Sequence, residues 1–254
     1  MALVASQELI LELRICFLSF DRAGYGESDP NLHGRQAIPL GDASDIYHTG
    51  MKIELAGAAL VVPIVNYWWP SFPAHLSREA YKRQLQRDQW KLRIAHYVPG
   101  LLYWWMSQKW FPSSSSYVEV VPEVYGNRDK QILKKMSGTL THNQNECFLF
   151  FPDCMTMIRQ QGVVESLHRD LMVGFGNWEF DPMELSNPFP NIESFVHIWQ
   201  GFEDPLVPVK LQQYVCRKQQ WIRYHEVAGG GHLIMCDTNL FEAILRELLL
   251  PSSV

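Results

Sequence analysis

Four apolar runs constrain the fold of this chain more than any other feature of its sequence. They are ICFLSFD at 15–21, AGAALVVPIV at 56–65, SFVHIWQG at 194–201 and WIRYHEV at 221–227. All are rich in β-branched and aromatic residues, and the first three are nearly continuously apolar. Strands that are buried on both faces have this pattern, whereas a strand with one face in water alternates. The runs therefore predict a parallel sheet that is covered on both faces.

Helices are predicted between and after these runs. Pro208 lies near the start of the segment DPLVPVKLQQYVCRK, in which Leu211, Tyr214 and Val215 have helical spacing, and proline is favoured in the first turn of a helix. In the last segment, Asn239 precedes an apolar stripe and is predicted to cap a helix. Strands that alternate with helices indicate an α/β fold, with a mostly parallel sheet, flanking helices and right-handed crossovers.

The long stretch between the second and third runs has a different composition. Residues 66–190 contain tryptophan-rich and proline-rich pieces such as NYWWP. We expect them to form an inserted helical lid over a mostly apolar pocket, between core parts at 1–65 and 191–254. The segment SREAYKRQLQRDQWKLRIAHYV is predicted to be a helix capped by Ser77. A second interpretation stays open, in which the tryptophans only pack the insertion against the core.

Charge, cysteine and histidine content exclude several kinds of site. The 22 basic and 27 acidic residues form no basic stripe, so nucleic acid is not expected as a partner. The five cysteines lack C-x-x-C spacing and the nine histidines lack an H-x-x-x-H pair, so neither a disulfide framework nor a metal site is expected. The segment AGYGES lacks the third glycine and the lysine of a phosphate-binding loop, and no cofactor is expected.

The N-terminal twenty residues are apolar but contain Glu8, Glu12 and Arg14. These charges argue against a signal peptide and against a membrane span, and no other apolar run is long enough to cross a bilayer. The cysteine usage fits a reducing compartment, so a cytoplasmic location is the default expectation.

A carboxylate and an imidazole follow two successive predicted strands. Asp204 comes after the third run in WQGFEDPLVP, and His232 comes after the fourth run in AGGGHL. Catalytic groups of open parallel sheets gather at the carboxyl ends of the strands. A carboxylate that is hydrogen-bonded to an imidazole fixes the ring tautomer and prepares a general base. We therefore take Asp204 and His232 as the candidate catalytic residues, and the alternative is a solvated His232 in a glycine turn.

Five segments carry a more specific signal. They are LSFDRAGYGESDP (18–30), ELAGAALVVPIVNYWWP (54–70), QQGVVESLHRDLMVGFGNWEFDPMEL (160–185), HIWQGFEDPLVP (197–208) and AGGGHL (228–233). Together they resemble a group of plant α/β-hydrolase-fold proteins of the AB hydrolase-1 type. In that family the GxEDxLVP element carries the catalytic acid and the GxGH element carries the base, so the resemblance gives those roles to Asp204 and His232. It implies a relative of serine esterases, which cleave carboxylic esters or similar acyl bonds, with a small apolar ester or acid as its ligand.

The nucleophile of that family is missing. The serine of this fold normally lies in a G-x-S-x-G turn between a strand and a helix, and no G-x-S-x-G occurs in this chain. The resemblance places that turn within 29–55, an interval too short for two helices, a strand and the turn at ~11 residues per helix and ~5 per strand. The apolar run at 145–157 reads as inserted sequence. We therefore expect a truncated α/β-hydrolase fold without the segment of the nucleophile and without the N-terminal strands.

Other residues are weaker candidates for the missing roles. Ser28 and Ser44 are the serines nearest the expected position, but neither has glycine-flanked surroundings that would expose and activate a hydroxyl. Asp181 is an alternative acid, although an aspartate before a proline more often forms an Asx turn. The sequence therefore predicts a catalytically impaired esterase relative. A non-catalytic module that binds a small molecule, and a truncated gene product without independent function, stay open as alternatives.

Overall fold

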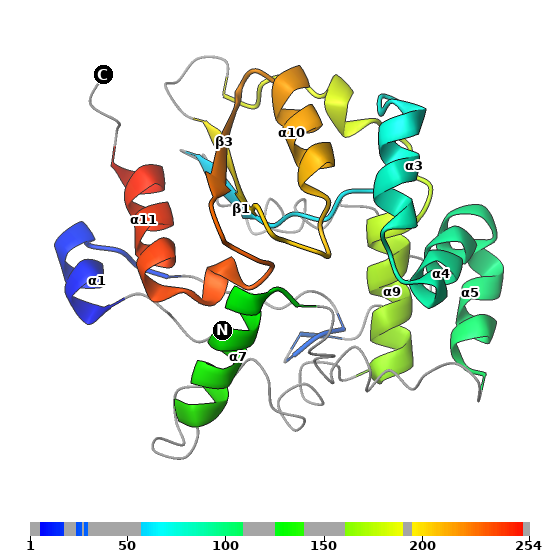
Figure 1. The fold of residues 1–254 in the computed structure, drawn as a ribbon, viewed down its shortest axis with the longest axis horizontal. Helices are drawn as coiled ribbons and strands as arrows, with labels where there is room; N and C mark the ends of the chain where they lie inside the picture. The colour runs from blue at the N-terminus through cyan, green and yellow to red at the C-terminus, as the bar shows by residue number, and fades with distance from the viewer. Residues whose placement is uncertain are drawn as a thin grey trace.

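A three-stranded parallel sheet lies at the centre of the computed structural model, which describes residues 6–17, 24–26, 28–29, 57–108, 125–139, 161–189 and 195–250. The strands are β1 (Ala58–Val61), β2 (Val196–Gly201) and β3 (Ile222–Val227), in that order across the sheet (Figure 1). Ala58 pairs with Val196, and Val196 pairs with Ile222. The protein is therefore mixed α/β, and three of the four predicted strands are confirmed as parallel neighbours.

The central strand explains the apolar pattern of its sequence. β2 has a hydrogen-bonded neighbour on each side, and all of its residues except Trp199 are buried. A strand in this position needs apolar side chains on both faces. The central position of β2 therefore accounts for the nearly continuous apolar run at 194–201.

The first predicted strand, at 15–21, is not confirmed. Residues 15–17 form a loop after α1 (Gln7–Leu13), and 18–21 lie outside the described residues. Arg14 ends α1 in a left-handed conformation with φ of 51°. The apolar side chains of Ile15 and Phe17 pack beside a small buried cluster instead of entering a sheet. Its buried members are Leu9, Phe241 and Leu245.

Two helices lie on opposite faces of the sheet (Figure 1). On one face, α10 (Val209–Lys218) contributes Leu211 and Val215 to a core against which Ile222 of β3 packs. On the other face, α11 (Thr238–Leu249) brings Leu248 close to Gly57, directly before β1. Pro208 immediately precedes α10, which confirms the predicted start of that helix.

The cap of α11 differs from the prediction. Asp237, and not Asn239, precedes the helix, and its carboxylate accepts hydrogen bonds from the backbone N–H groups of Asn239 and Leu240. Arg128 contacts the same carboxylate at 2.8 Å and holds it at the start of the helix. The predicted apolar stripe is buried at three positions, Phe241, Ile244 and Leu245.

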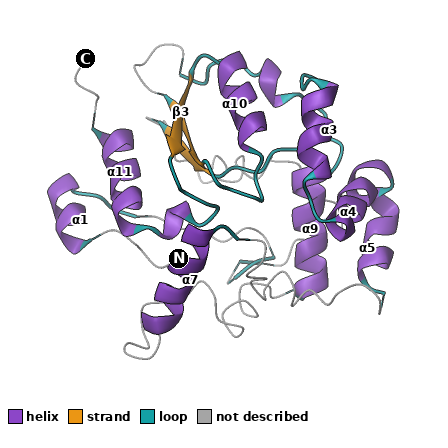
Figure 2. Cartoon of the chain, in the orientation of Figure 1, coloured by secondary structure: helices purple, strands orange, loops and turns teal. Residues whose placement is uncertain are grey.

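The described parts of residues 66–190 are mainly helical (Figure 2). Their helices are α3 (Ala74–Lys82), α4 (Gln86–Tyr97), α5 (Pro99–Met106), α7 (Asn127–Thr139) and α9 (Val163–Phe175). No helix in the described ranges has the length and apolar character that crossing a bilayer requires.

The helix predicted to start at Ser77 is in fact two helices, and Ser77 caps neither. α3 starts directly after Pro73, whose ring fixes φ near the helical value. Ser77 is the fourth residue of α3, and its hydroxyl donates to the backbone carbonyl of Tyr67. The chain leaves the helical conformation after Arg83, and α4 begins at Gln86.

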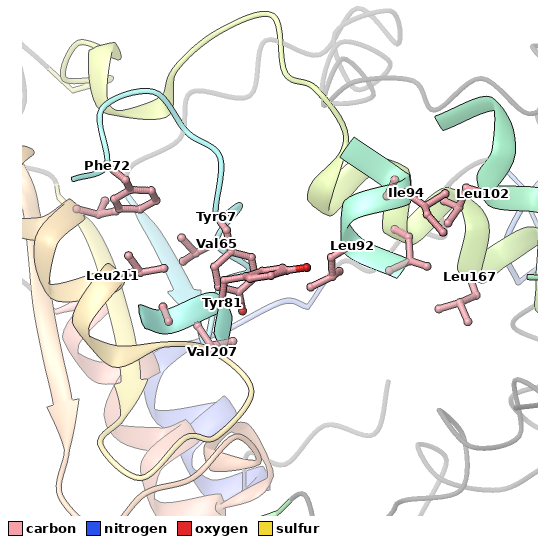
Figure 3. Close-up of a cluster of buried hydrophobic side chains, with 14 of the residues drawn as sticks. Val65, Tyr67, Phe72, Tyr81, Leu92, Ile94, Leu102, Leu167, Val207 and Leu211 are labelled. Carbon is pink, nitrogen blue, oxygen red and sulfur yellow. The ribbon is translucent and has the colours of Figure 1, made fainter. Parts of the chain in front are cut away.

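One apolar core joins α3, α4, α5 and α9 to α10, which packs on the sheet (Figure 3). Leu102 of α5 and Leu211 of α10 are both fully buried in it, and full burial of such a side chain stabilises a fold by roughly 1.5–3 kcal/mol. Three tryptophans pack against this core, namely Trp68, Trp69 and Trp105. These three side chains therefore contribute to packing of the insertion, and Trp68 also lines a pocket.

Candidate active site

Asp204 lies in the loop that follows β2, and the surrounding hydrogen bonds hold its carboxylate in place. Oδ1 accepts hydrogen bonds from the backbone N–H groups of Leu206 (2.8 Å) and Val207 (3.0 Å). Oδ2 accepts a hydrogen bond from Nε2 of Gln200 (3.2 Å) and lies 3.0 Å from Nδ1 of His232. The side chain is completely buried. These contacts therefore fix the direction in which Oδ2 faces the imidazole.

His232 lies in the loop that follows β3, and Asp204 orients its ring. Three other N–H groups already point at the Asp204 carboxylate, so it acts as an acceptor and Nδ1 of His232 carries the hydrogen. In the neutral ring with this tautomer, Nε2 carries the lone pair. The imidazole is 28% exposed, and no hydrogen-bond partner of Nε2 is found among the described residues. The pair can therefore accept a proton from a molecule that reaches this edge of the sheet.

The glycines before His232 allow two loops to approach each other closely. A Cβ at Gly201, the last residue of β2, would overlap with the backbone carbonyl of Gly231 and lie 2.6 Å from that of Gly230. A Cβ at Gly230 would lie 2.9 Å from the side chains of Val227 and Ile234. Only residues without a Cβ fit this backbone contact. The glycine run is thus a packing requirement that brings the His232 loop against the Asp204 loop.

Asp129 holds the backbone of His232 by hydrogen bonds, and its role was not predicted from the sequence. Its Oδ2 accepts a hydrogen bond from the backbone N–H of His232 (2.9 Å), and its Oδ1 accepts one from Leu233 (2.9 Å). The residue is fully buried in the first turn of α7, which places its carboxylate against the Gly231 backbone. An acidic residue in a first helical turn is common, so the only sequence signal was too general to identify this contact.

Two tyrosines lie close enough to these carboxylates for the charges to affect them. Burial raises the pKa of Tyr125, and the carboxylates of Asp129 and Asp204 raise it further. The pKa of Tyr67 is also raised, first by burial and then by Tyr81 and Asp204. Both phenols therefore stay protonated near neutral pH and are available as hydrogen-bond donors beside the Asp204 loop.

The weaker candidates from the sequence have other positions. Asp181 is buried, and its carboxylate accepts hydrogen bonds from the backbone N–H groups of Met183 (2.9 Å) and Ser71 (2.7 Å). It therefore forms the turn at Pro182–Glu184, and the Asx-turn interpretation is confirmed. Ser28 follows Gly24 and Gly26, which both have positive φ, and its N–H donates to the carbonyl of Tyr25. Ser44 and the run at 145–157 lie outside the described residues.

A pocket of about 420 Å³ is formed by the first helices of the insertion. Tyr67, whose pKa is raised in part by the Asp204 carboxylate, is one of its lining residues. Aromatic rings and two guanidinium groups make up most of the surface. The lining residues are Tyr67, Trp68, Phe72, Ala74, Ser77, Arg78, Tyr81, Arg93 and Tyr97.

Comparison with known proteins gives no family for the sequence. No family model matches the chain, and no curated protein matches it. Among solved structures, an alpha/beta hydrolase enzyme from a Medee basin deep-sea metagenome library is similar, with a TM-score of 0.48 and 13% identity over 92% of this chain and 79% of that chain. A thermophilic esterase from Thermogutta terrifontis, solved with malate bound, is similar with a TM-score of 0.41 and 15% identity over 89% of this chain and 78% of that chain.

Proposed function

We propose that this protein is an α/β-hydrolase-type relative of serine esterases that has kept the acid and the base of a catalytic triad and lost the nucleophile. One observation carries the proposal, namely the 3.0 Å hydrogen bond between Asp204 and His232 at the carboxyl ends of adjacent parallel strands. The absence of G-x-S-x-G from the sequence supports the second half of the proposal. Ester hydrolysis by an acyl-enzyme route is therefore expected to be impaired.

The chemistry that remains is that of a general base. Nε2 of His232 is able to take a proton from a water molecule, while the Asp204 carboxylate stabilises the resulting imidazolium. General-base assistance alone contributes a rate factor of about 10²–10⁴. A serine in a strained turn adds covalent catalysis and a backbone N–H for the oxyanion. Any esterase activity of this chain is therefore expected to be slow and to leave no acyl-enzyme.

The test combines labelling with turnover. Purified protein is treated with a fluorophosphonate probe and assayed with short-chain p-nitrophenyl esters, beside the variants Asp204→Asn and His232→Ala. We expect no labelled serine, and slow turnover at most, which both variants reduce to the level of buffer. Stoichiometric labelling of any serine, together with its loss in His232→Ala, would show an intact triad and contradict the proposal.

The pocket favours a second candidate function, the binding of a small apolar acid or ester without conversion. Its tyrosine, tryptophan and phenylalanine walls suit an apolar body. The guanidinium groups of Arg78 and Arg93 suit a carboxylate, to which arginine donates two parallel hydrogen bonds. We infer that residues 66–190 form a lid, and the first part of this segment carries all of the lining residues of the pocket, at 67–97.

Ligand binding is tested with 4-phenylbutyrate and its methyl ester as probes in thermal unfolding. If the protein is a binding module, the acid raises Tm in wild type and in His232→Ala, and the effect is lost in the double variant Arg78→Gln/Arg93→Gln. Glu184→Gln, which changes an exposed carboxylate outside the pocket, serves as the matched control. Equal Tm values with and without both probes would exclude this ligand class.

A further inference from the structure

Two imidazoles and a carboxylate converge on the face of the sheet that α11 covers. Nδ1 of His197 on β2 lies 2.9 Å from Nε2 of His225 on β3. A carboxylate oxygen of Glu247 on α11 completes the group, and the three ligand atoms all lie within 4.8 Å of one another. These side chains come from three elements that are separated along the chain, so no short sequence motif marks them.

The register of the sheet explains why these side chains meet. His197 pairs with Arg223, and Trp199 pairs with His225, so all four side chains are on one face. His197 and His225 are therefore diagonal neighbours on adjacent strands, a spacing that long side chains can bridge. Trp199 stacks on the His225 ring at 4.1 Å and 8° and restricts its rotation. His197 is buried, so the pair is held by its surroundings and does not swing freely in solvent.

We propose that His197, His225 and Glu247 form a binding site for a divalent transition-metal cation, with Zn²⁺ as its expected occupant. Imidazole and carboxylate are preferred ligands of Zn²⁺, with metal–nitrogen distances of about 2.0–2.1 Å. In a tetrahedral site two nitrogens at that distance are about 3.3–3.4 Å apart. The two ring nitrogens are 2.9 Å apart and hydrogen-bonded to each other, so the rings separate by roughly 0.4–0.5 Å when the ion replaces the shared hydrogen. The Glu247 carboxylate must move closer to the two nitrogens to join them, and its side chain is 35% exposed and has room to move.

Arg223 competes with the cation. Its guanidinium lies 3.7 Å from Glu247 and stacks over Phe195 at 3.5 Å. A positive charge beside the carboxylate weakens the attraction for a metal ion. The site therefore binds Zn²⁺ less tightly than a closed four-ligand structural site does, and removal of the Arg223 charge strengthens binding.

The site is separate from the Asp204–His232 pair. His197 and His225 lie within strands β2 and β3, whereas Asp204 and His232 lie in the loops beyond the ends of those strands. A bound ion would connect β2, β3 and α11, and an ion that binds only the folded state raises the free energy of unfolding by RT ln(1 + L/Kd), where L is the free ion concentration. The expected role of the ion is thus structural.

Zinc binding is measured on the purified, reduced full chain by titration calorimetry and by the change in Tm. We expect one equivalent to bind and Tm to rise. Affinity falls at least about tenfold in His225→Gln and in Glu247→Gln. It is unchanged in His75→Gln, which alters an exposed histidine on α3, and it increases in Arg223→Gln.

Cobalt distinguishes this site from the cysteines. Co²⁺ bound by imidazole and carboxylate lacks the strong near-ultraviolet band that thiolate ligands produce, and the described chain contains free cysteines at Cys16, Cys216 and Cys236. Far-UV circular dichroism checks that each variant is folded, and Glu247→Gln is nearly isosteric at a partly exposed position of α11. The proposal fails if wild type binds no metal, if the thiolate band appears, or if His225→Gln and Glu247→Gln bind the metal as tightly as wild type and the His75→Gln control do.

Discussion

Replacement of Asp129 by alanine gives the sharpest test of how His232 is positioned. The carboxylate of Asp129 accepts hydrogen bonds from the backbone N–H groups of His232 and Leu233, and it is fully buried. In Asp129→Ala both donors lose their partner. A buried donor without a partner costs about 1–3 kcal/mol, and the two together are expected to cost about 2–4 kcal/mol because the His232 amide is partly accessible to water.

Two measurements check this expectation. Urea unfolding gives the loss of free energy, and for a chain of this size about 2–4 kcal/mol corresponds to a Tm lower by roughly 5–15 °C. Proton NMR gives the position of the ring, because the Nδ1–H of His232 that is hydrogen-bonded to Asp204 has a low-field resonance. We expect that resonance to broaden or disappear in Asp129→Ala. Asp129→Asn retains one acceptor oxygen and recovers part of both effects.

Glu184→Ala is the matched control, because it removes an exposed carboxylate. It should change stability by no more than about 0.5 kcal/mol. If Asp129→Ala unfolds at the same urea concentration as Glu184→Ala and keeps the low-field resonance, then Asp129 does not position His232 and the reasoning is refuted.

Three further predictions concern the framework of the site. Gly201→Ala forces a Cβ into the backbone carbonyls of the glycine loop and should lower the urea midpoint and remove the His232 resonance. Gly100→Ala, where a Cβ on helix α5 meets nothing within 4 Å, should keep the resonance and should not lower the midpoint. Leu211→Ala should cost about 2–5 kcal/mol in urea unfolding because the side chain is fully buried, and a cost below 1 kcal/mol would contradict the assigned core. Hydrogen bonding to Arg128 lowers the folded-state pKa of Asp237. Its contribution to stability is therefore present above the unfolded pKa near ~4 and is lost as pH falls through the lower folded pKa. The difference in urea midpoint between wild type and Arg128→Gln should shrink over that acidic range, and a difference that grows would refute the assignment.

Three of the strands, and the proximity of Asp204 and His232, were predictable because local signals determine them. A central parallel strand needs a nearly continuous apolar run, which SFVHIWQG supplies. Asp204 and His232 lie in the loops after two predicted strands, and parallel strands bring their carboxyl ends to one edge of a sheet. The proximity of the two residues therefore required only the assumption that the strands are neighbours.

Contacts between distant segments could not be predicted in this way. Asp129 is 103 residues from His232 along the chain, and nothing in its neighbourhood indicates a partner in a glycine loop. Strand register and helix placement alone bring together His197, His225 and Glu247. The lack of an H-x-x-x-H motif in the sequence therefore did not exclude this cluster. The caps of α3 and α11 were placed wrongly because Ser77 and Asn239 both resemble capping residues, and the choice depended on tertiary contacts of Tyr67 and Arg128.

The same contacts limit how the proposed lid can work. Asp129 belongs to the segment 66–190, yet its carboxylate holds the loop of His232. Val207 and Leu211, which follow Asp204, share a buried core with Tyr81 of α3 and Leu102 of α5. Movement of α3 and α5 away from the sheet would expose these apolar side chains to water. The exposure of each would cost roughly 1.5–3 kcal/mol of stability. We infer that the described part of the insertion forms a fixed wall of the pocket and a support for His232, and that a ligand enters without displacement of α3 from α10.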